Sequence, residues 1–254
     1  MEISTDSSTR TPDTAQAQTG CSPVAAMRDL GSHLRFWITA SVVVWLDLWS
    51  KHWVFSTLAS SERRTIIPGT VEFRRSLNDG AVFGSFTGLT EVFIIASLFA
   101  LGFVFYLYAH STRKQRALHL ALGLILAGAI GNLYDRAFVT ADVVTHRRAD
   151  GREESIIGSI VSDPEDRVIR IGDWPDGANP RSFMRADATA HRQGVVRDFI
   201  KLLPRFPAWI PRIGGQEIWA WVFNVADAAL VCGVGVLLIN TWLDRKYAAA
   251  PANE

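Results

Sequence analysis

Cysteine and net charge are both scarce in this sequence of 254 residues. Its two cysteines, Cys21 and Cys232, are too few for a disulfide framework or a four-ligand zinc site. Cys232 lies in an apolar run, where we expect a small buried hydrophobic side chain. Lys and Arg number 26 against 25 Asp and Glu, so the formal net charge is only +1. This balance provides no strongly basic field and predicts that nucleic acid is not a partner.

The N-terminal segment lacks the apolar core of a signal peptide. Its first 26 residues are rich in Ser, Thr, Ala and Gln, so they are not a cleavable targeting sequence. We interpret residues 1–33 as a disordered cytoplasmic tail and residues 246–254 as a second cytoplasmic tail. Apolar residues make up 48% of the chain and concentrate in long runs between these tails. Residues 34–245 are therefore predicted to form one membrane domain.

Four apolar runs are long enough to cross a bilayer, which requires about 20 apolar residues per helix. They cover residues 34–55, 90–110, 117–136 and 217–241. Tryptophans gather toward the ends of these runs, as in the aromatic belts of membrane proteins. We therefore predict an all-α membrane protein with four transmembrane helices. A small β-rich loop region on the outer surface and a long insertion between helices three and four complete the expected fold.

The predicted insertion covers residues 138–193 and is polar and nearly balanced in charge. Short strands are predicted at residues 155–161 and 167–171, followed by a turn signal at Pro175-Asp176-Gly177. Both an extra outer-surface module and a partly disordered segment fit this composition. The sequence assigns the insertion no function.

Basic residues in the short loops predict the orientation. Arg28 and Arg35 precede the first run, residues 113–116 connect the second and third, and Arg245 and Lys246 follow the fourth. All of these positions lie on one side, and an excess of Lys and Arg marks the cytoplasmic side. We predict that both termini are cytoplasmic. Four arginines in the first outer loop argue for the opposite orientation: Arg63, Arg64, Arg74 and Arg75.

Polar side chains occur within three of the apolar runs, where a charge costs several kcal/mol and usually has a partner or a function. They are Asp47, Lys51, Asn132, Asp135, Arg136, Asn224 and Asp227. Structural ion pairs between neighbouring members, such as Asp47 with Lys51 or Asp135 with Arg136, are one explanation. The two asparagines would then be hydrogen-bonding residues between helices.

Asp227 does not fit that explanation, because no Lys or Arg lies within ten residues of it. Two carboxyl groups held close together share one proton and activate a water molecule in aspartic proteases. Asp198, in the short apolar segment 196–200 before the fourth run, is the predicted second acid. Asp135 is its rival.

Five short motifs follow one another along the chain. They are Asp47-Leu48-Trp49-Ser50-Lys51, Asn78-Asp79-Gly80-Ala81-Val82-Phe83, Gly131-Asn132-Leu133-Tyr134-Asp135-Arg136, Val196-Arg197-Asp198-Phe199 and Phe223-Asn224-Val225-Ala226-Asp227. In this order, over residues 34–245, the sequence resembles the lipoprotein signal peptidases, which are aspartic membrane proteases also called signal peptidase II. The long insertion and the N-terminal tail depart from the family pattern.

The resemblance implies that Asp198 and Asp227 are the catalytic aspartates. It implies supporting or substrate-binding roles at Asp47, Lys51, Asn78, Gly80, Asn132, Asp135, Arg136, Asn224 and Ala226. The family cuts prolipoproteins just before a cysteine that bears a diacylglyceryl group, and it requires no metal or other cofactor. Expected partners are therefore such prolipoproteins and membrane lipids. The expected location is the bacterial inner membrane, with the active site toward the outer leaflet.

A small proton- or cation-coupled transporter using Asp47, Asp135 and Asp227 is the alternative from another functional class. A transport path needs polar groups across the membrane, whereas the expected positions of these groups lie in one leaflet. A purely structural assembly protein leaves Asp227 unexplained. The motif order favours the peptidase over both.

Overall fold

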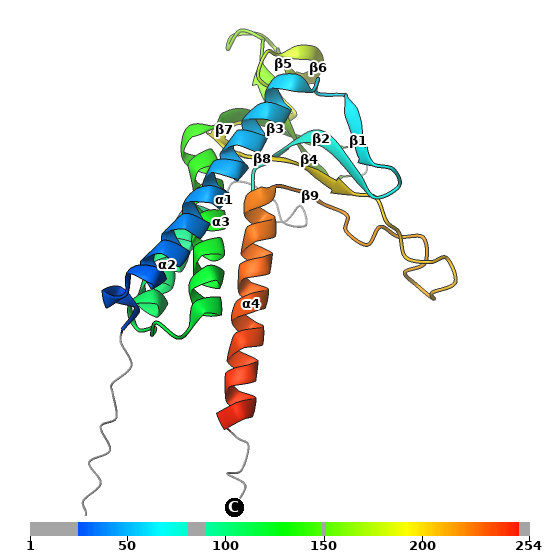
Figure 1. Cartoon of the computed structure of the whole chain (residues 1–254). Coiled ribbons are helices and arrows are strands. Elements are labelled where there is room, and N and C mark those ends of the chain that lie inside the picture. The colour runs from blue at the N-terminus through cyan, green and yellow to red at the C-terminus, as the bar shows by residue number, and fades with distance from the viewer. Residues whose placement is uncertain (1–24, 81–89, 149–150, 249–254) are drawn as a thin grey trace, which may run out of the picture.

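Helices and sheets occupy opposite ends of the molecule (Figure 1). The structure, a computed structural model, describes residues 25–80, 90–148 and 151–248. A short 3-10 turn at Ala26–Arg28 precedes α1 (Leu30–Thr57). The other helices are α2 (Thr90–Ala109), α3 (Arg116–Phe138) and α4 (Val225–Ala248). The start of α1, the α2–α3 turn and the end of α4 all lie at the end away from the sheets.

Two antiparallel sheets form the other end. The first contains, in spatial order, β1 (Arg63–Ile67), β2 (Val71–Asn78), β8 (Val196–Leu202) and β9 (Val222–Phe223). The strands of the second are β3 (Thr140–Arg147), β4 (Glu153–Ile160), β5 (Val168–Asp173), β6 (Ala178–Met184) and β7 (Ala188–Gly194). Their spatial order is β6-β5-β4-β3-β7. Because Thr140 pairs with Gly194, this second sheet starts and ends at the same place, between α3 and β8.

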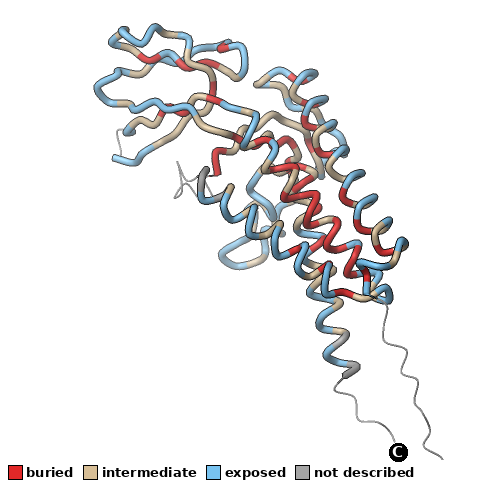
Figure 2. Tube along the Cα trace, turned by 90° about the vertical axis from the view of Figure 1, so that its left-hand side faces the viewer, coloured by how far each residue is buried: buried red, intermediate tan, exposed pale blue. Residues whose placement is uncertain are grey.

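The central helix of the bundle is α3, which packs against α1, α2 and α4. Much of it is buried (Figure 2), and small residues supply a large part of that buried surface. Small side chains allow helices to approach closely. The small buried residues of α3 are Ala121, Gly123, Ala127, Gly128, Ala129 and Gly131.

A second apolar cluster attaches the four-stranded sheet to the end of α1. Phe199 of β8 is buried against Val54 and Leu58, and Phe73 of β2 meets the Phe199 ring edge-to-face at 5.2 Å between centroids. Burying side chains of this size stabilises the contact by roughly 1.5–3 kcal/mol each. Strand β8 is thereby fixed against the C-terminal end of α1.

The expected all-α fold with four transmembrane helices is wrong. Nine strands in two sheets occur among the described residues. Within those residues, two helices are long and apolar enough to cross a membrane, Arg116–Phe138 and Val225–Leu243, and Ile94–Ala109 is a shorter apolar helix. Apart from those expected at 155–161 and 167–171, the strands escaped prediction because they are short, and a search for long apolar runs does not register them.

Helix boundaries also differ from the expected ones. Helix α1 begins at Leu30, so the last residues of the expected tail 1–33 are helical, while residues 1–24 lie outside the described chain. The run at 217–241 is divided, because β9 occupies Val222–Phe223 and α4 starts only at Val225. Cys232 is exposed rather than buried, since it lies on a face of α4 that the other helices do not cover.

The expected strands at 155–161 and 167–171 are present as β4 and β5, and the described residues of the insertion form the five-stranded sheet. Trp174 attaches it to the rest of the protein. Its ring meets Phe55 of α1 edge-on at 6.1 Å between centroids, and its indole N–H donates to the Thr140 carbonyl of the insertion itself at 3.0 Å. Arg75 of β2 donates to the Trp174 carbonyl. The insertion therefore contacts both α1 and the four-stranded sheet.

Candidate active site

Asn224 and Asp227 together cap the N-terminus of α4. The Asp227 N–H donates to the Asn224 side-chain oxygen at 3.0 Å, and the Asn224 N–H donates to Asp227 Oδ2 at 3.0 Å. This reciprocal pair is the geometry of a capping box, with Asn in place of Ser and Asp in place of Glu. Asp227 therefore lies in the first turn of the helix, where the helix dipole favours a negative charge. In the expected helix 217–241, Asp227 would instead lie nearly three turns from the start (~15 Å from Glu217).

Asp198 reaches the same place from the middle of the four-stranded sheet. Strand β8 pairs with β2 on one side and β9 on the other, and the Asp198 side chain is buried. Asn78 Nδ2 donates to Asp198 Oδ2 at 3.1 Å, and Asn224 Nδ2 donates to Asp198 Oδ1 at 2.6 Å. Asn224 therefore binds both aspartates, Asp198 through its side chain and Asp227 through its backbone N–H.

Burial is the main cause that raises the pKa of Asp198 to about 7, and the negative charge of nearby Asp227 raises it further. Hydrogen bonds from Asn78 and Asn224 act in the opposite direction and limit the rise. A carboxyl group with such a pKa exchanges a proton readily at neutral pH, as acid–base catalysis requires.

Asn132 of α3 supports Asp227 from the other side. Its Nδ2 donates to Asp227 Oδ1 at 2.8 Å, while its Oδ1 accepts from Asn224 Nδ2 at 3.1 Å and from Lys51 Nζ at 3.3 Å. Because both donors approach the oxygen, the amide orientation is fixed with the nitrogen toward Asp227.

Lys51 is completely buried and sits between two carboxylates. Its Nζ lies 2.8 Å from Asp47 Oδ2 and 3.4 Å from Asp135 Oδ2. A buried charge requires such partners, because removing it from water without them costs several kcal/mol. The pairing predicted between Asp47 and Lys51 is thus present, and Asp135 joins it from α3.

Asp47 and Gly131 bring α1 and α3 close to the start of α4. Asp47 Oδ1 accepts a hydrogen bond from the Ala226 N–H at 2.8 Å. A Cβ atom at Gly131 would lie 2.5 Å from Asp47 Oδ2, so no other residue fits there without displacing the carboxylate. The three helices therefore meet through Asp47, Gly131 and Ala226.

Gly80 orients Asn78. The Gly80 N–H donates to Asn78 Oδ1 at 2.8 Å, which leaves the amide nitrogen of Asn78 facing Asp198. Gly80 has φ +92°, a conformation that residues with a side chain rarely adopt. The last three residues of this motif, 81–83, lie outside the described residues.

Comparison with known proteins agrees with this geometry. The family model described as signal peptidase (SPase) II matches residues 39–243. The chain belongs to the signal peptidase II family. It is an aspartic-type peptidase and a bacterial membrane enzyme.

Two relatives illustrate the similarity. The lipoprotein signal peptidase of Desulfitobacterium hafniense (strain DSM 10664 / DCB-2) is 27% identical over 211 residues, which cover 83% of this chain and 95% of the relative. That of Syntrophomonas wolfei is 28% identical over 213 residues, covering 84% and 96%. A bacterial membrane enzyme solved by the in meso method at 2.3 Å has a TM-score of 0.55 at 19% identity, covering 89% of this chain and 95% of its own. At that identity, the likeness shows a shared fold.

Asp135, the rival for the second acid in this signal peptidase, is held by Arg197. Arg197 donates to it through its backbone N–H at 2.9 Å and through Nη2 at 2.6 Å. Together with Lys51, this gives Asp135 two cationic partners. Asp135 is thus part of an ion-pair network that connects α1, α3 and β8.

Arg197 is the site residue that sequence reasoning missed. Its position next to Asp198 in the chain could have identified it. Alternate side chains of a strand point to opposite faces, so Arg197 can reach the end of α3 while Asp198 faces the other way. Arg136 is half-buried, and its guanidinium interacts electrostatically with Asp227 and Asp198. The contacts given above connect the other predicted site residues to the network around Asn224 and Lys51.

No group of three or more His, Cys, Asp or Glu side chains suited to a metal ion occurs in the described ranges 25–80, 90–148 and 151–248.

Proposed function

We propose that this signal peptidase removes signal peptides from prolipoproteins whose cysteine carries a diacylglyceryl group, and that it cuts just before that cysteine. Membership of the family and the curated relatives support the removal of signal peptides from prolipoproteins. The requirement for the lipid group and the position of the cut follow from the resemblance described above and are part of the proposal.

Asp198 and Asp227 are the proposed catalytic acids. The observation that carries this assignment is their common partner, Asn224, which donates hydrogen bonds to both. Two acids that share a proton can divide the work of peptide hydrolysis. The ionised one takes a proton from water as the water attacks the scissile carbonyl, and the protonated one donates to the leaving group.

The surroundings of the two acids support different roles for them. Asp198 is 2% exposed and its raised pKa, about 7, makes it the proton donor. Asp227 accepts N–H donors from Asn132 and Asn224 at the N-terminus of α4, which suits the ionised partner. Asp135, held between Lys51 and Arg197, has the two cationic partners of a structural ion-pair network.

A transporter remains the competing class, and the geometry does not favour it. Asp47, Asp135 and Asp227 belong to one compact network where α1, α3, β8 and the start of α4 meet. A path across the helices would need polar groups along their whole length.

The decisive test uses purified protein and a prolipoprotein substrate in two forms, with and without the diacylglyceryl group. We expect the lipidated form alone to lose its signal peptide, seen as a shift in mass to the value for a cut before the cysteine. Cleavage at another bond, or equal cleavage of both forms, would contradict the proposed specificity. Ion transport in vesicles without any cleavage would favour the competing class.

The proposed orientation places both termini in the cytoplasm and the active site toward the outer leaflet, among membrane lipids. Arg35, Arg113 and Arg116 lie together at the helix end away from the sheets, and such clusters mark the cytoplasmic side. In a chain with Cys21→Ser and Cys232→Ser, single cysteines replace His110, which is exposed at the α2–α3 turn, or Ser159. An impermeant thiol reagent outside intact cells should label position 159 and leave position 110 unlabelled. Labelling of position 110 alone would contradict the proposed orientation.

A further inference from the structure

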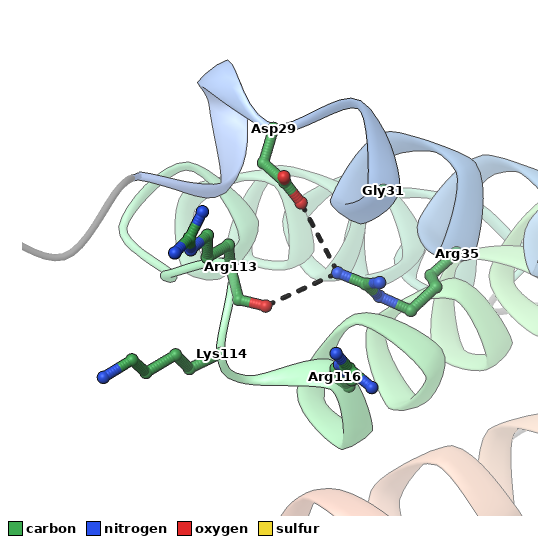
Figure 3. A pocket seen from close by; sticks show the side chains of 6 residues that line it. All are labelled: Asp29, Gly31, Arg35, Arg113, Lys114 and Arg116. Carbon is green, nitrogen blue, oxygen red and sulfur yellow. Dashed lines mark hydrogen bonds and ion pairs between the residues drawn. The ribbon is translucent and has the colours of Figure 1, made fainter.

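A basic pocket lies at the helix end opposite the candidate active site. Figure 3 shows the side chains that line it. The volume of the pocket is about 460 Å³. Its walls come from the start of α1 and from the turn that joins α2 to α3. The lining residues are Asp29, Gly31, Arg35, Arg113, Lys114 and Arg116. Four cationic side chains therefore surround this space, against a single carboxylate.

The one carboxylate is already occupied. Asp29 caps α1, where its Oδ2 accepts from the Ser32 N–H at 2.8 Å and from the Ser32 hydroxyl at 2.7 Å. It also lies 3.5 Å from Arg35 Nη2. Asp29 carries one negative charge, which attracts both Arg35 and Arg113, so a net charge of three positive units is left within the pocket.

The cations have unused donors. No ion pair of Arg113, Lys114 or Arg116 with an acid occurs within the described part of the chain. Arg35 donates through Nη2 to the Arg113 carbonyl at 3.5 Å, but its Nε is buried and has no acceptor among the described residues. A buried donor without an acceptor is costly, and an anion in the pocket would satisfy it.

An apolar surface borders this pocket. Leu30 and Leu34, the neighbours of Gly31 and Arg35 on α1, are 72% and 49% exposed. Trp37, one turn further along the same helix, is also exposed. A soluble anion would meet only the basic residues, whereas a phospholipid would place its headgroup on them and its acyl chains along the leucines.

We propose that this pocket binds the phosphate group of an anionic phospholipid headgroup. Guanidinium groups match phosphate oxygens with paired hydrogen bonds, and basic pockets between helices hold anionic headgroups at membrane surfaces. The site is separate from the proposed catalytic acids, so this proposal stands or falls independently of the peptidase mechanism.

The test counts bound lipid on the purified full-length protein. Protein in neutral detergent is titrated with phosphatidylglycerol or with phosphatidylcholine, and retained lipid is counted by native mass spectrometry. We expect phosphatidylglycerol to bind about tenfold more tightly, because the pocket adds charge attraction to the apolar contacts. Equal binding of the two lipids would overturn the proposal.

A pair of double variants separates the pocket from the general positive charge of this end. Arg113→Gln/Arg116→Gln removes two pocket cations, and Arg245→Gln/Lys246→Gln removes two cations from the last turn of α4, outside the pocket. The first should lose the preference for phosphatidylglycerol by about tenfold, and the second should keep it within about twofold. An equal loss of this preference in both variants would show that the general positive charge of this end attracts the lipid, and would overturn the proposed site.

Two further measurements complete the test. Both variants should melt at the wild-type temperature in phosphatidylcholine alone, because the four substituted side chains are exposed. If the pocket variant melts at a lower temperature, Arg116→Gln alone takes its place. An excess of inorganic phosphate should leave phosphatidylglycerol bound, because the acyl chains contribute to its affinity. Displacement by inorganic phosphate would overturn the lipid as the ligand.

Discussion

The side-chain amide of Asn224 donates a hydrogen bond to Asp198 across 2.6 Å, although the two residues lie 26 positions apart in the sequence. Asn224 stands at the junction of β9 and α4, and Asp198 lies in the neighbouring strand β8. The same asparagine caps α4 with Asp227. One residue thus fixes the position of both proposed catalytic acids, and helix capping and active-site geometry depend on each other.

The first prediction concerns the two acids. Asp198→Asn and Asp227→Asn should each reduce cleavage by at least about 10²–10⁴-fold, because each removes one half of the proton exchange while preserving shape. Asp135→Asn should keep measurable activity and lower stability instead, since it weakens the pairs with Lys51 and Arg197. The measurement is the rate of prolipoprotein cleavage at matched membrane insertion. Normal cleavage by Asp198→Asn together with an inactive Asp135→Asn would assign the second acid to α3.

The second prediction concerns the pH dependence of cleavage. The pKa of Asp198 is about 7, so the proposed proton donor is lost as the pH rises through neutrality. We expect kcat/KM to decline on the alkaline side of about pH 7, in the form that a single deprotonation produces. A value of kcat/KM that stays constant from about pH 6 to about pH 9 would contradict the role of Asp198.

Stability should depend on the same group, with a defined sign. The pKa of Asp198 is raised above its ordinary value of 3.8, so the folded protein holds this proton more tightly than the unfolded chain does. Its contribution to stability is therefore complete at acid pH and is lost as the pH rises toward about 7, by about 1.4 kcal/mol per pH unit at most. The melting temperature of the wild type, relative to Asp198→Asn, should fall across this window. If the melting temperatures of the two proteins change with pH in the same way, Asp198 does not hold the proposed proton.

The third prediction concerns Lys51. Lys51→Met leaves Asp47 and part of Asp135 without their buried cation, and we expect a loss of about 3–5 kcal/mol in unfolding free energy. The double variant Lys51→Met/Asp47→Asn should recover part of this loss, because the amide oxygen still accepts from the Ala226 N–H and no longer carries charge. Thermal unfolding of the purified proteins measures both. A double variant less stable than the sum of the single changes would show that the pair is not the source of the cost.

The fourth prediction concerns the five-stranded insertion. Ala141 and Gln193 face each other in the β3–β7 ladder, so a short Gly/Ser linker can replace residues 142–192 without moving the ends. We expect measurable cleavage to remain, because none of the proposed site residues lies in the removed part. Trp174→Ala is the matched control, since it releases the contacts with Phe55 and Thr140 while keeping the module. A shortened protein that folds, inserts and yet does not cleave would show that the insertion shapes the site.

Much of the candidate site was predictable from the sequence for a local reason. Asp47 and Lys51 are four residues apart on one helix, so their contact depends on neighbouring residues alone. Asn224 and Asp227 have the spacing of a capping box, but this cap was missed because the expected helix 217–241 ran through both residues. Asp227 also stood out because no basic residue lies near it in the chain. Such short-range relations survive without knowledge of the fold.

Only the tertiary structure determined the contacts that depend on pairing between strands far apart in the sequence. Which acid joins Asp227 depended on β8 pairing with β2 and β9, and the partner of Asp135 depended on Arg197 of the same strand. Hydropathy indicated the apolar runs, yet it missed the sheets and extended the last run across β9. Strand pairing joins residues far apart in sequence, and its energy comes from contacts that exist only after the chain has folded. The sequence by itself therefore determined the chemical groups and their local spacing, and the fold determined which of them meet.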